Sequence, residues 1–228
     1  MNRTIRFLQS LQHSDGGFDS VKVAYYVVES LSHLGAKPLR TLDKFVESLR
    51  PLIENLGKSD VYVEAISEIE ALYFAVEMLK SNGSLQDAIE LQKQIFKMQN
   101  TDGSFGSKKF SRIASTFYAL KTLKLLDYDL KKLRDTLKWI RRCELPSGGF
   151  TAEPELSSKY MVIEDVYFGV KTLEVLNERC LYPKETLKLI AKFQNPNGGF
   201  RRSIFLGISD FESTCQAVSI FKTLSPHF

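Results

Sequence analysis

The sequence is poor in the residues that support metal and disulfide chemistry. Its 228 residues include only three cysteines, three histidines and one tryptophan. Cys143, Cys180 and Cys215 are an odd number without a Cys-x-x-Cys pair, which argues against a zinc knuckle and predicts reduced thiols in a cytoplasmic protein. No apolar run approaches the roughly 18 residues of a spanning helix, so no membrane span is predicted. Residues Met1–Phe7 lack the apolar segment of a secretory signal.

A strong charge of either sign is also missing. There are 31 lysines and arginines against 27 acids, a net charge of +4. This excess is too weak and too evenly spread to predict a nucleic-acid partner. A chain of this length, with 43% hydrophobic residues, buries a core without help from disulfides or a structural metal. Composition therefore predicts a globular protein and leaves its function open.

What the sequence does contain is a repeated turn. Four segments end in Gly-Gly-Phe or Gly-Ser-Phe and start 87, 45 and 50 residues apart: Gln12–Phe18, Gln99–Phe105, Glu144–Phe150 and Gln194–Phe200. The Asp or Asn before the first glycine is predicted to supply a positive φ, and the closing Phe to fold back as a hydrophobic plug. The gap of 87 is about two periods, so Glu54–Asp60 is interpreted as the remnant of a further copy.

A helix with one theme is predicted after each turn. The copies occupy residues 25–31, 73–79, 117–123, 167–173 and 215–221. All have a small or β-branched residue at the third place and an apolar residue at the seventh, and their apolar flanks predict inner helices buried on most of their surface. More amphipathic segments precede the turns. In residues 130–140 the leucines and Ile140 line one face and basic residues cover the other, which predicts a one-sided outer helix.

Five pairs of one outer and one inner helix, at a period of 43–50 residues, predict an all-α protein that forms an α/α toroid. One domain is predicted over residues 1–228, with repeats at about 1–35, 36–82, 83–127, 128–179 and 180–228. Open helical solenoids have a similar period but lack the glycine turn.

The Gln-x-x-Asp-Gly-Gly-Phe turn followed by a Thr-x-Tyr-Ala-Leu helix resembles the prenyltransferase and squalene-cyclase repeat, over essentially residues 4–224. The resemblance implies an α/α toroid with a central apolar cavity. Active members join isoprenoid chains to a cysteine thiol or cyclise them. Members usually have six inner helices, so five leave this ring one pair short.

The resemblance also locates the positions of a catalytic zinc site. Protein prenyltransferases hold zinc with an Asp, a Cys two residues later and a His on the next inner helix. Glu164, Val166 and Ser213 stand at these places. An alkyl side chain cannot bind metal, so neither a zinc site nor another cofactor is predicted. The Asp-x-Asp-Asp motif of the cyclases is also missing, and its nearest approach at 127–129 is expected to cap a helix with Asp129.

The diphosphate-binding residues of the family are better matched. Arg112 stands where members have a diphosphate-binding His, Tyr167 where a Tyr follows the zinc pair, and Lys159 two residues from a family Lys. Such groups would neutralise the departing diphosphate, and the pair Arg201–Arg202 is a further candidate. Because 31 of 228 residues are basic, an ordinary solvated surface is the alternative.

Acids and aromatics on the inner helices allow two interpretations each. Acids begin three helices: Glu68 and Glu70, Glu164 and Asp165, Asp210 and Glu212. They either cap the helices or form a cation-binding rim, in which Glu164, Asp165 and Glu212 are weak catalytic candidates. Adjacent aromatics recur at 25–26, 73–74, 117–118 and 167–168. They either fill the core or line an isoprenoid cavity, for which the candidates are Tyr26, Tyr73, Tyr118 and Tyr167.

Three functions follow, and whether the protein is an enzyme stays open. The first is a prenyltransferase β-subunit-like protein that binds a prenyl diphosphate or another hydrophobic ligand without zinc. The second is a non-catalytic toroid that binds a peptide, a protein partner or a second copy of itself. The third is an α/α-toroid carbohydrate-active enzyme, which needs paired carboxylates such as Glu70 with Glu164 or Glu212 but has only Trp139 to stack on a sugar. The sequence favours the first.

Overall fold

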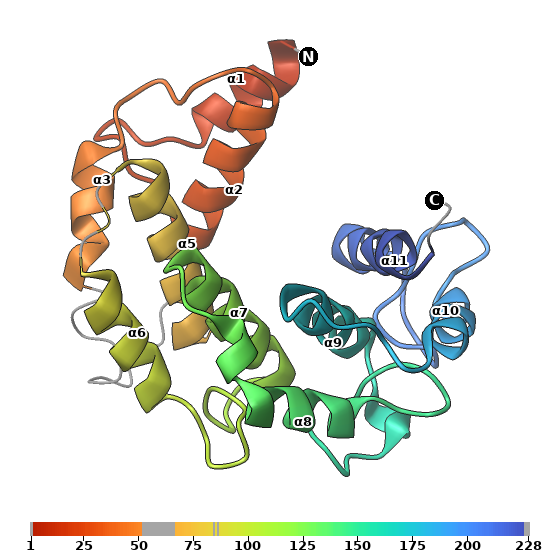
Figure 1. The fold of residues 1–228 in the computed structure, drawn as a ribbon. Coiled ribbons are helices and arrows are strands. Elements are labelled where there is room, and N and C mark those ends of the chain that lie inside the picture. The colour runs from red at the N-terminus through yellow and green to blue at the C-terminus, as the bar shows by residue number, and fades with distance from the viewer. Residues whose placement is uncertain (1, 52–66, 84, 86, 226–228) are drawn as a thin grey trace. The chain divides into compact units, whose positions relative to one another are not determined.

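The computed structural model describes residues 2–51, 67–83, 85 and 87–225. This part of the chain forms ten α-helices and two short 3-10 helices and no strand, which confirms the all-α prediction (Figure 1). The predicted turn remnant at Glu54–Asp60 lies outside the described residues. None of the helices described is both long and apolar enough to cross a bilayer.

Outer and inner helices alternate along the described chain. The outer helices are α1 (Asn2–Ser10), α3 (Asp43–Ser48), α6 (Ala88–Lys97), α8 (Arg134–Cys143) and α10 (Pro183–Ala191). The inner helices are α2 (Val21–His33), α5 (Glu68–Ser81), α7 (Arg112–Leu125), α9 (Ile163–Val175) and α11 (Phe211–Leu224). Each of the five predicted inner segments lies within one inner helix. The described residues therefore confirm five helix pairs.

The chain divides into two compact units. Unit 1 comprises residues 1–97 and 125–128, and unit 2 comprises residues 98–124 and 129–228. Within unit 1, α1 packs on α2, while α2 and α3 pack on α5. Within unit 2, α8 packs on α9, α10 packs on α11, and α9 lies against α11. In each unit, outer helices cover inner helices that lie side by side.

The four glycine turns share one backbone hydrogen bond and a positive φ at the first glycine. In each, the amide of the first glycine donates to the carbonyl three residues earlier, as Gly103 does to Asn100 at 2.9 Å. The four first glycines have φ values of 86–94°. The positive φ thus belongs to glycine, which has no Cβ to clash, and the prediction that the preceding Asp or Asn supplies it is wrong. Those side chains instead accept an amide hydrogen bond from two residues on, as Asp102 does from Ser104 at 3.0 Å.

The closing phenylalanines are plugs, as predicted. The buried set is Phe18, Phe105, Phe150 and Phe200. The amide of Phe105 donates to Oγ1 of Thr116 on α7 at 3.0 Å, which ties the turn to its inner helix. Phe150 lies so close to α9 that a Cβ on Gly169 would come within 2.6 Å of its ring. This packing explains why the third place of that inner helix holds a residue without a side chain.

The outer helix predicted at 130–140 begins later than expected. Residues Leu130–Lys132 form a 3-10 turn, and α8 starts only at Arg134. The Asp129 carboxylate accepts a hydrogen bond from the Lys131 amide at 3.2 Å, so Asp129 is a cap, as predicted. That local bond competes with the α-helical ladder. The buried face of α8 accordingly consists of Thr136, Trp139, Ile140 and Cys143 rather than the leucine stripe.

The start of the next outer helix covers the turns of unit 2 at 99–105 and 144–150. The hydroxyl of Thr136 on α8 donates to the Gly103 carbonyl at 2.7 Å, and Thr186 on α10 accepts from the Gly149 amide at 3.0 Å. A Cβ on Gly103 or Gly148 would lie 2.6 Å from the backbone nitrogen of Thr136 or Thr186. Glycine is therefore required at both turns by close packing as well as by φ.

Gly148→Ala is expected to lower the free energy of unfolding by about 1–3 kcal/mol more than Gly198→Ala, because the added methyl meets the backbone of α10. Gly198 is a matched control, since it has a similar positive φ of 86° but no atom of unit 2 within 4 Å of the added Cβ. Urea unfolding followed by circular dichroism at one low protein concentration measures both. Equal losses would show that only the φ strain matters.

Candidate functional site

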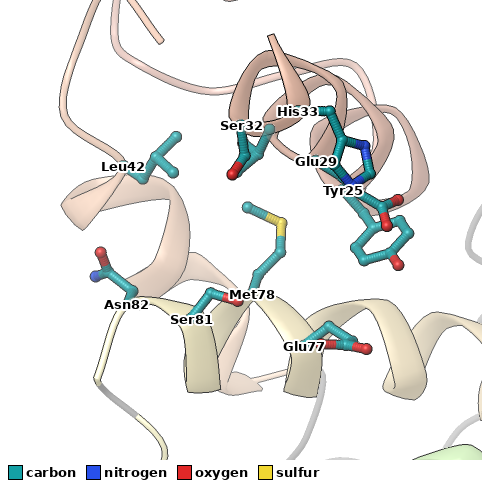
Figure 2. Close-up of a pocket in the computed structure, with 10 residues that line it drawn as sticks. Tyr25, Glu29, Ser32, His33, Leu42, Glu77, Met78, Ser81 and Asn82 are labelled. Atoms are coloured by element: carbon teal, nitrogen blue, oxygen red, sulfur yellow. The ribbon is translucent and has the colours of Figure 1, made fainter. Parts of the chain in front are cut away.

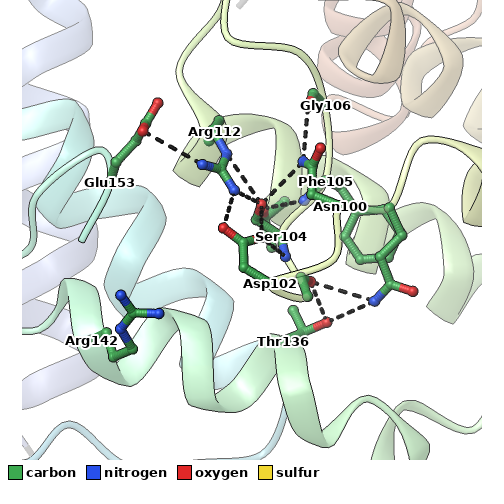
Figure 3. A network of polar contacts seen from close by, with 12 residues as sticks. Asn100, Asp102, Ser104, Phe105, Gly106, Arg112, Thr136, Arg142 and Glu153 are labelled. Atoms are coloured by element: carbon green, nitrogen blue, oxygen red, sulfur yellow. Dashed lines mark hydrogen bonds and ion pairs between the residues drawn. The ribbon is translucent and has the colours of Figure 1, made fainter.

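In unit 2 the side chain of Arg112, the first residue of α7, contacts the 99–105 turn that precedes the helix (Figure 3). Its guanidinium forms an ion pair with Asp102 and donates through Nε to Ser104 Oγ at 3.1 Å. Nη1 reaches Glu153 Oε2 at 3.5 Å, and the guanidinium carbon lies 5.4 Å from the centre of the Trp139 ring. Arg112 is thus a buried connection between α7, the 99–105 turn and the loop after α8.

Arg112 has one positive charge and pairs with two carboxylates, those of Asp102 and Glu153, so these three side chains carry a net charge of −1. Burial opposes ionisation of Asp102, but hydrogen bonds from Ser104 and Arg112 outweigh it and hold the pKa of Asp102 below its usual value. The contact to Glu153 is long at 3.5 Å, and the Glu153 side chain is 32% exposed. The Nη1 edge is therefore the side on which another anion has least to displace.

The other polar residues predicted for a site are not among the bonded partners of Arg112. Lys159 is exposed in the 3-10 helix η2 (Ser158–Tyr160), with Nζ 4.7 Å over the Tyr160 ring. Glu164, in the first turn of α9, pairs with Arg202 at 2.8 Å. Glu212 is exposed in the first turn of α11. Among the ion pairs found in the described part of unit 2, none joins Glu212 to Arg112 or Lys159 to Asp102 or Glu153.

Asp165 is the acid most altered by its surroundings. Its carboxylate accepts a hydrogen bond from the Val162 amide at 3.2 Å at the start of α9. Burial raises the pKa of Asp165 to about 6 despite that bond. Asp210 is itself the N-cap of α11 and accepts from the Ser213 amide, three residues later, at 2.7 Å. The capping interpretation is confirmed for these two acids, and a cation-binding rim stays a prediction.

The residues at the family's zinc positions do not fit that metal. The Glu164 carboxylate is engaged by Arg202, Val166 offers no donor atom, and the Ser213 hydroxyl donates to Asp210 at 2.7 Å. Within the residues described, no three His, Cys, Asp or Glu side chains gather as a metal-binding group. Burial also raises the pKa of Cys180 to about 12, which disfavours the thiolate that binds zinc.

Aromatic side chains of α7 and α9 pack against one another in unit 2. The Phe168 ring lies 5.4 Å from that of Phe117 and 5.6 Å from that of Tyr118, and Tyr167 lies 6.4 Å from Phe117. The two α7 residues are buried, whereas Tyr167 and Phe168 are partly exposed. Tyr118 is therefore core, and the rings on α9 are the accessible part of this cluster.

The same repeat positions meet in unit 1 on α2 and α5. The Tyr25 ring lies 6.0 Å from that of Tyr73 and 5.0 Å from that of Phe74. Tyr26 is 48% exposed, whereas Tyr73 is buried and donates to Glu77 at 2.8 Å. Burial raises the pKa of Tyr25 to about 12 and that of Tyr73 far above its usual value, so both hydroxyls are neutral at physiological pH.

A pocket of about 340 Å³ in unit 1 is lined by residues of α2 and α5, with Leu42 before α3 (Figure 2). Its walls include Tyr25, Met78 and the carboxylates of Glu29 and Glu77. Two carboxylates beside the negative ends of two helices disfavour a diphosphate. No motif pointed to this pocket. One signal was present, because both glutamates occupy the fifth place of the inner repeat.

Comparison with known proteins supports the helical repeat. The sequence model of the prenyltransferase alpha-alpha toroid domain matches residues 1–110 and 106–227. Among solved structures, the Candida albicans protein geranylgeranyltransferase-I complexed with GGPP is similar, with a TM-score of 0.60 and 22% identity over 70% of this chain and 50% of that chain. The match thus spans half the length of that chain, and at this identity it concerns the fold. No curated protein matches the sequence.

Asp165→Asn is expected to become relatively more stabilising as pH rises. In the native protein the pKa of about 6 lies above the ordinary 3.8, so the unfolded chain loses this proton first and stability falls as pH rises through that window. The asparagine variant lacks this loss, which amounts to about 3 kcal/mol for a shift of about two units. Urea unfolding between about pH 4 and pH 7 measures it. Glu212→Gln, at an exposed acid of α11, is the control, and an equal pH dependence of both variants would contradict the prediction.

Arg112→Gln is expected to lower the free energy of unfolding by about 2–4 kcal/mol, because it removes a buried guanidinium and the charged partner of the partly exposed Asp102. Arg142→Gln is the matched control, since its pair with Glu155 at 2.8 Å is exposed and contributes less than about 1 kcal/mol. Chemical denaturation compares the two. In the double variant Asp102→Asn/Arg112→Gln part of the loss should be recovered; equal effects of both arginine changes would contradict the buried network.

Proposed function

We propose, since the chain belongs to the prenyltransferase alpha-alpha toroid domain family, that it binds an isoprenoid or prenyl-diphosphate ligand on the aromatic side chains of its inner helices. One observation carries the proposal: the same adjacent aromatic positions recur on four successive inner helices and stack between helices within each unit. Aromatic faces suit an apolar chain. The similar Candida albicans structure is a complex with GGPP.

The isoprenoid chain, in this proposal, contacts the accessible rings. Tyr167 supplies one in unit 2, where Tyr118 backs the cluster from α7. Unit 1 has an accessible ring of its own in Tyr26, which is backed by Tyr73 and is proposed as a separate surface for an apolar chain. These rings have large apolar faces and few rotatable bonds, so contact with them costs little side-chain entropy.

The diphosphate end is proposed to meet Arg112. This residue lies five positions before Phe117 on α7, about 8 Å along the helix axis. A phosphate oxygen would replace Glu153 on Nη1, the longest of its contacts at 3.5 Å, while Asp102 keeps the guanidinium in place. Guanidinium groups bind phosphate oxygens strongly. Lys159, on the same loop as Glu153, would add a second cation. The carboxylates of the unit 1 pocket disfavour a diphosphate there, which favours its placement in unit 2.

We propose binding without the family's zinc, because the donor set at Glu164, Val166 and Ser213 does not fit that metal. Of the acids named as catalytic candidates, Asp165 has a pKa near neutrality, but its carboxylate is occupied as a helix cap. No reaction is assigned to it. The three cysteines are unpaired, which supports the proposed cytoplasmic location.

The experiment uses Trp139, the single tryptophan, which is stacked with Arg112. The full chain is titrated with geranylgeranyl diphosphate, geranylgeraniol and inorganic pyrophosphate, with affinity measured by calorimetry and Trp139 emission recorded in parallel. Both isoprenoids are expected to bind saturably. Only the ligands with a diphosphate should disturb the Arg112–Trp139 stack and change the emission.

Variants locate the ligand. Tyr167→Ala and Phe168→Ala are expected to weaken both isoprenoids by about tenfold or more, a loss of about 1.4 kcal/mol. Arg112→Gln should weaken the diphosphate alone. Tyr182→Ala, which removes an aromatic residue at the start of an outer helix, is the control and should change neither affinity. A helical protein that binds neither isoprenoid would refute the proposal, and binding that is indifferent to Tyr167 and Phe168 would refute its location.

A further inference from the structure

The last inner helix exposes a face that the inner helices before it bury. Two positions define this face. They lie four residues before and three residues after the first residue of each inner segment, which is residue 73, 117, 167 or 215. On α5, α7 and α9 they are at most 2% exposed and hold Ile69 and Val76, Ile113 and Leu120, Ile163 and Val170. On α11 they hold Phe211 and Val218, which are 88% and 58% exposed. Cys215 lies between them and is exposed as well.

The last glycine turn is open in the same way. Gly103 and Gly148 are covered by the start of the following outer helix, but no atom of unit 2 lies within 4 Å of a Cβ built on Gly198. The loop from this turn to α11 adds Phe205, Leu206 and Ile208, all more than two-thirds exposed. We call the Gln194–Phe200 turn with the exposed face of α11 the tail surface. Its residues are those that a following helix pair would cover.

Helix α1 has a threonine at the position that, on α8 and α10, bonds to the turns at 99–105 and 144–150. Thr136 and Thr186 each lie eight residues before the first residue of their own repeat's turn. Thr4 lies at the same distance before Gln12 and, like them, is followed by an apolar and then a basic residue. Thr4 is exposed on α1, and Phe7, about one turn further, is 61% exposed.

The neighbouring inner helix α2 has a matching apolar edge. Tyr26 is 48% exposed, whereas Phe74 on α5 and Tyr118 on α7, at the equivalent repeat position, are 1% and 8% exposed. We call Thr4, Phe7 and Tyr26 the head surface. Charge also matches, because α1 contains two arginines and no acid, while the first turn of α11 exposes Glu212.

We propose that the head surface of a second copy of this chain docks on the tail surface, in the manner of a following repeat. The Thr4 hydroxyl would meet the Gly198 carbonyl as Thr136 meets Gly103 at 2.7 Å. Phe7 and Tyr26 would cover Phe211 and Val218. Each copy has one head and one tail, so the contact is heterologous, and two copies that exchange both contacts form a closed dimer. This inference does not depend on the proposed ligand.

Sedimentation velocity of the full chain over an approximately hundredfold concentration range is the first test. We expect a dimer whose proportion rises with concentration. Phe7→Asp blocks the head and Phe211→Asp blocks the tail, and each should raise the dissociation constant at least about tenfold, a loss of about 1.4 kcal/mol. Both side chains are exposed, so the folded chain should keep its circular dichroism. Leu181→Asp, at a residue that is 60% exposed outside both surfaces, is the matched control.

The decisive measurement mixes the two variants. A Phe7→Asp copy retains its tail and a Phe211→Asp copy retains its head, so the mixture should form a heterodimer at concentrations where each variant alone is monomeric. A chain that is monomeric at every concentration, including one that closes on itself, would overturn the proposal. A dimer that tolerates both substitutions, or a mixture that stays monomeric, would overturn it as well.

Discussion

The contact between a glycine turn and the first turn of the next outer helix underlies the arrangement of the repeats. At Gly103 and Gly148 the backbones approach so closely that no Cβ fits. A threonine hydroxyl then joins the two segments with a hydrogen bond of 2.7–3.0 Å. On the other side of each turn the phenylalanine enters the core beneath its own inner helix. One seven-residue turn thus holds an inner helix and the following repeat together.

Arg112, the residue proposed to bind a diphosphate, is part of this same framework. Asp102 accepts the Ser104 amide within the turn and also pairs with Arg112, which starts the inner helix. The guanidinium is therefore fixed by the fold before any ligand arrives. A ligand that exchanged for Glu153 would leave the turn intact, whereas one that displaced Asp102 would disrupt it. The fold and the candidate site share the Asp102–Arg112 pair, so the proposed anion would meet Arg112 only on its Glu153 side.

The two units differ in their charged groups and therefore in the ligands proposed for them. The unit 1 pocket combines two carboxylates with one tyrosine that remains neutral, because burial raises the pKa of Tyr25 to about 12. Unit 2 offers a guanidinium with one weakly held edge and accessible rings on α9. Asp165 shows a further effect of burial. It caps α9, and burial raises the pKa of its carboxyl to about 6.

The sequence by itself determined the repeat, the inner helices and the phenylalanine plugs, because glycine spacing and helical periodicity are local properties that each copy carries. It misjudged the start of α8, because the Asp129 cap delays the helix. It also misjudged the source of the positive φ, which belongs to glycine because glycine has no Cβ. Only the tertiary structure showed that Glu153 reaches Arg112 from 41 residues away, that Glu29 and Glu77 share a pocket, and that Phe211 is exposed where Ile163 is buried. These facts depend on which side chains packing brings together, and a repeat pattern does not contain that information.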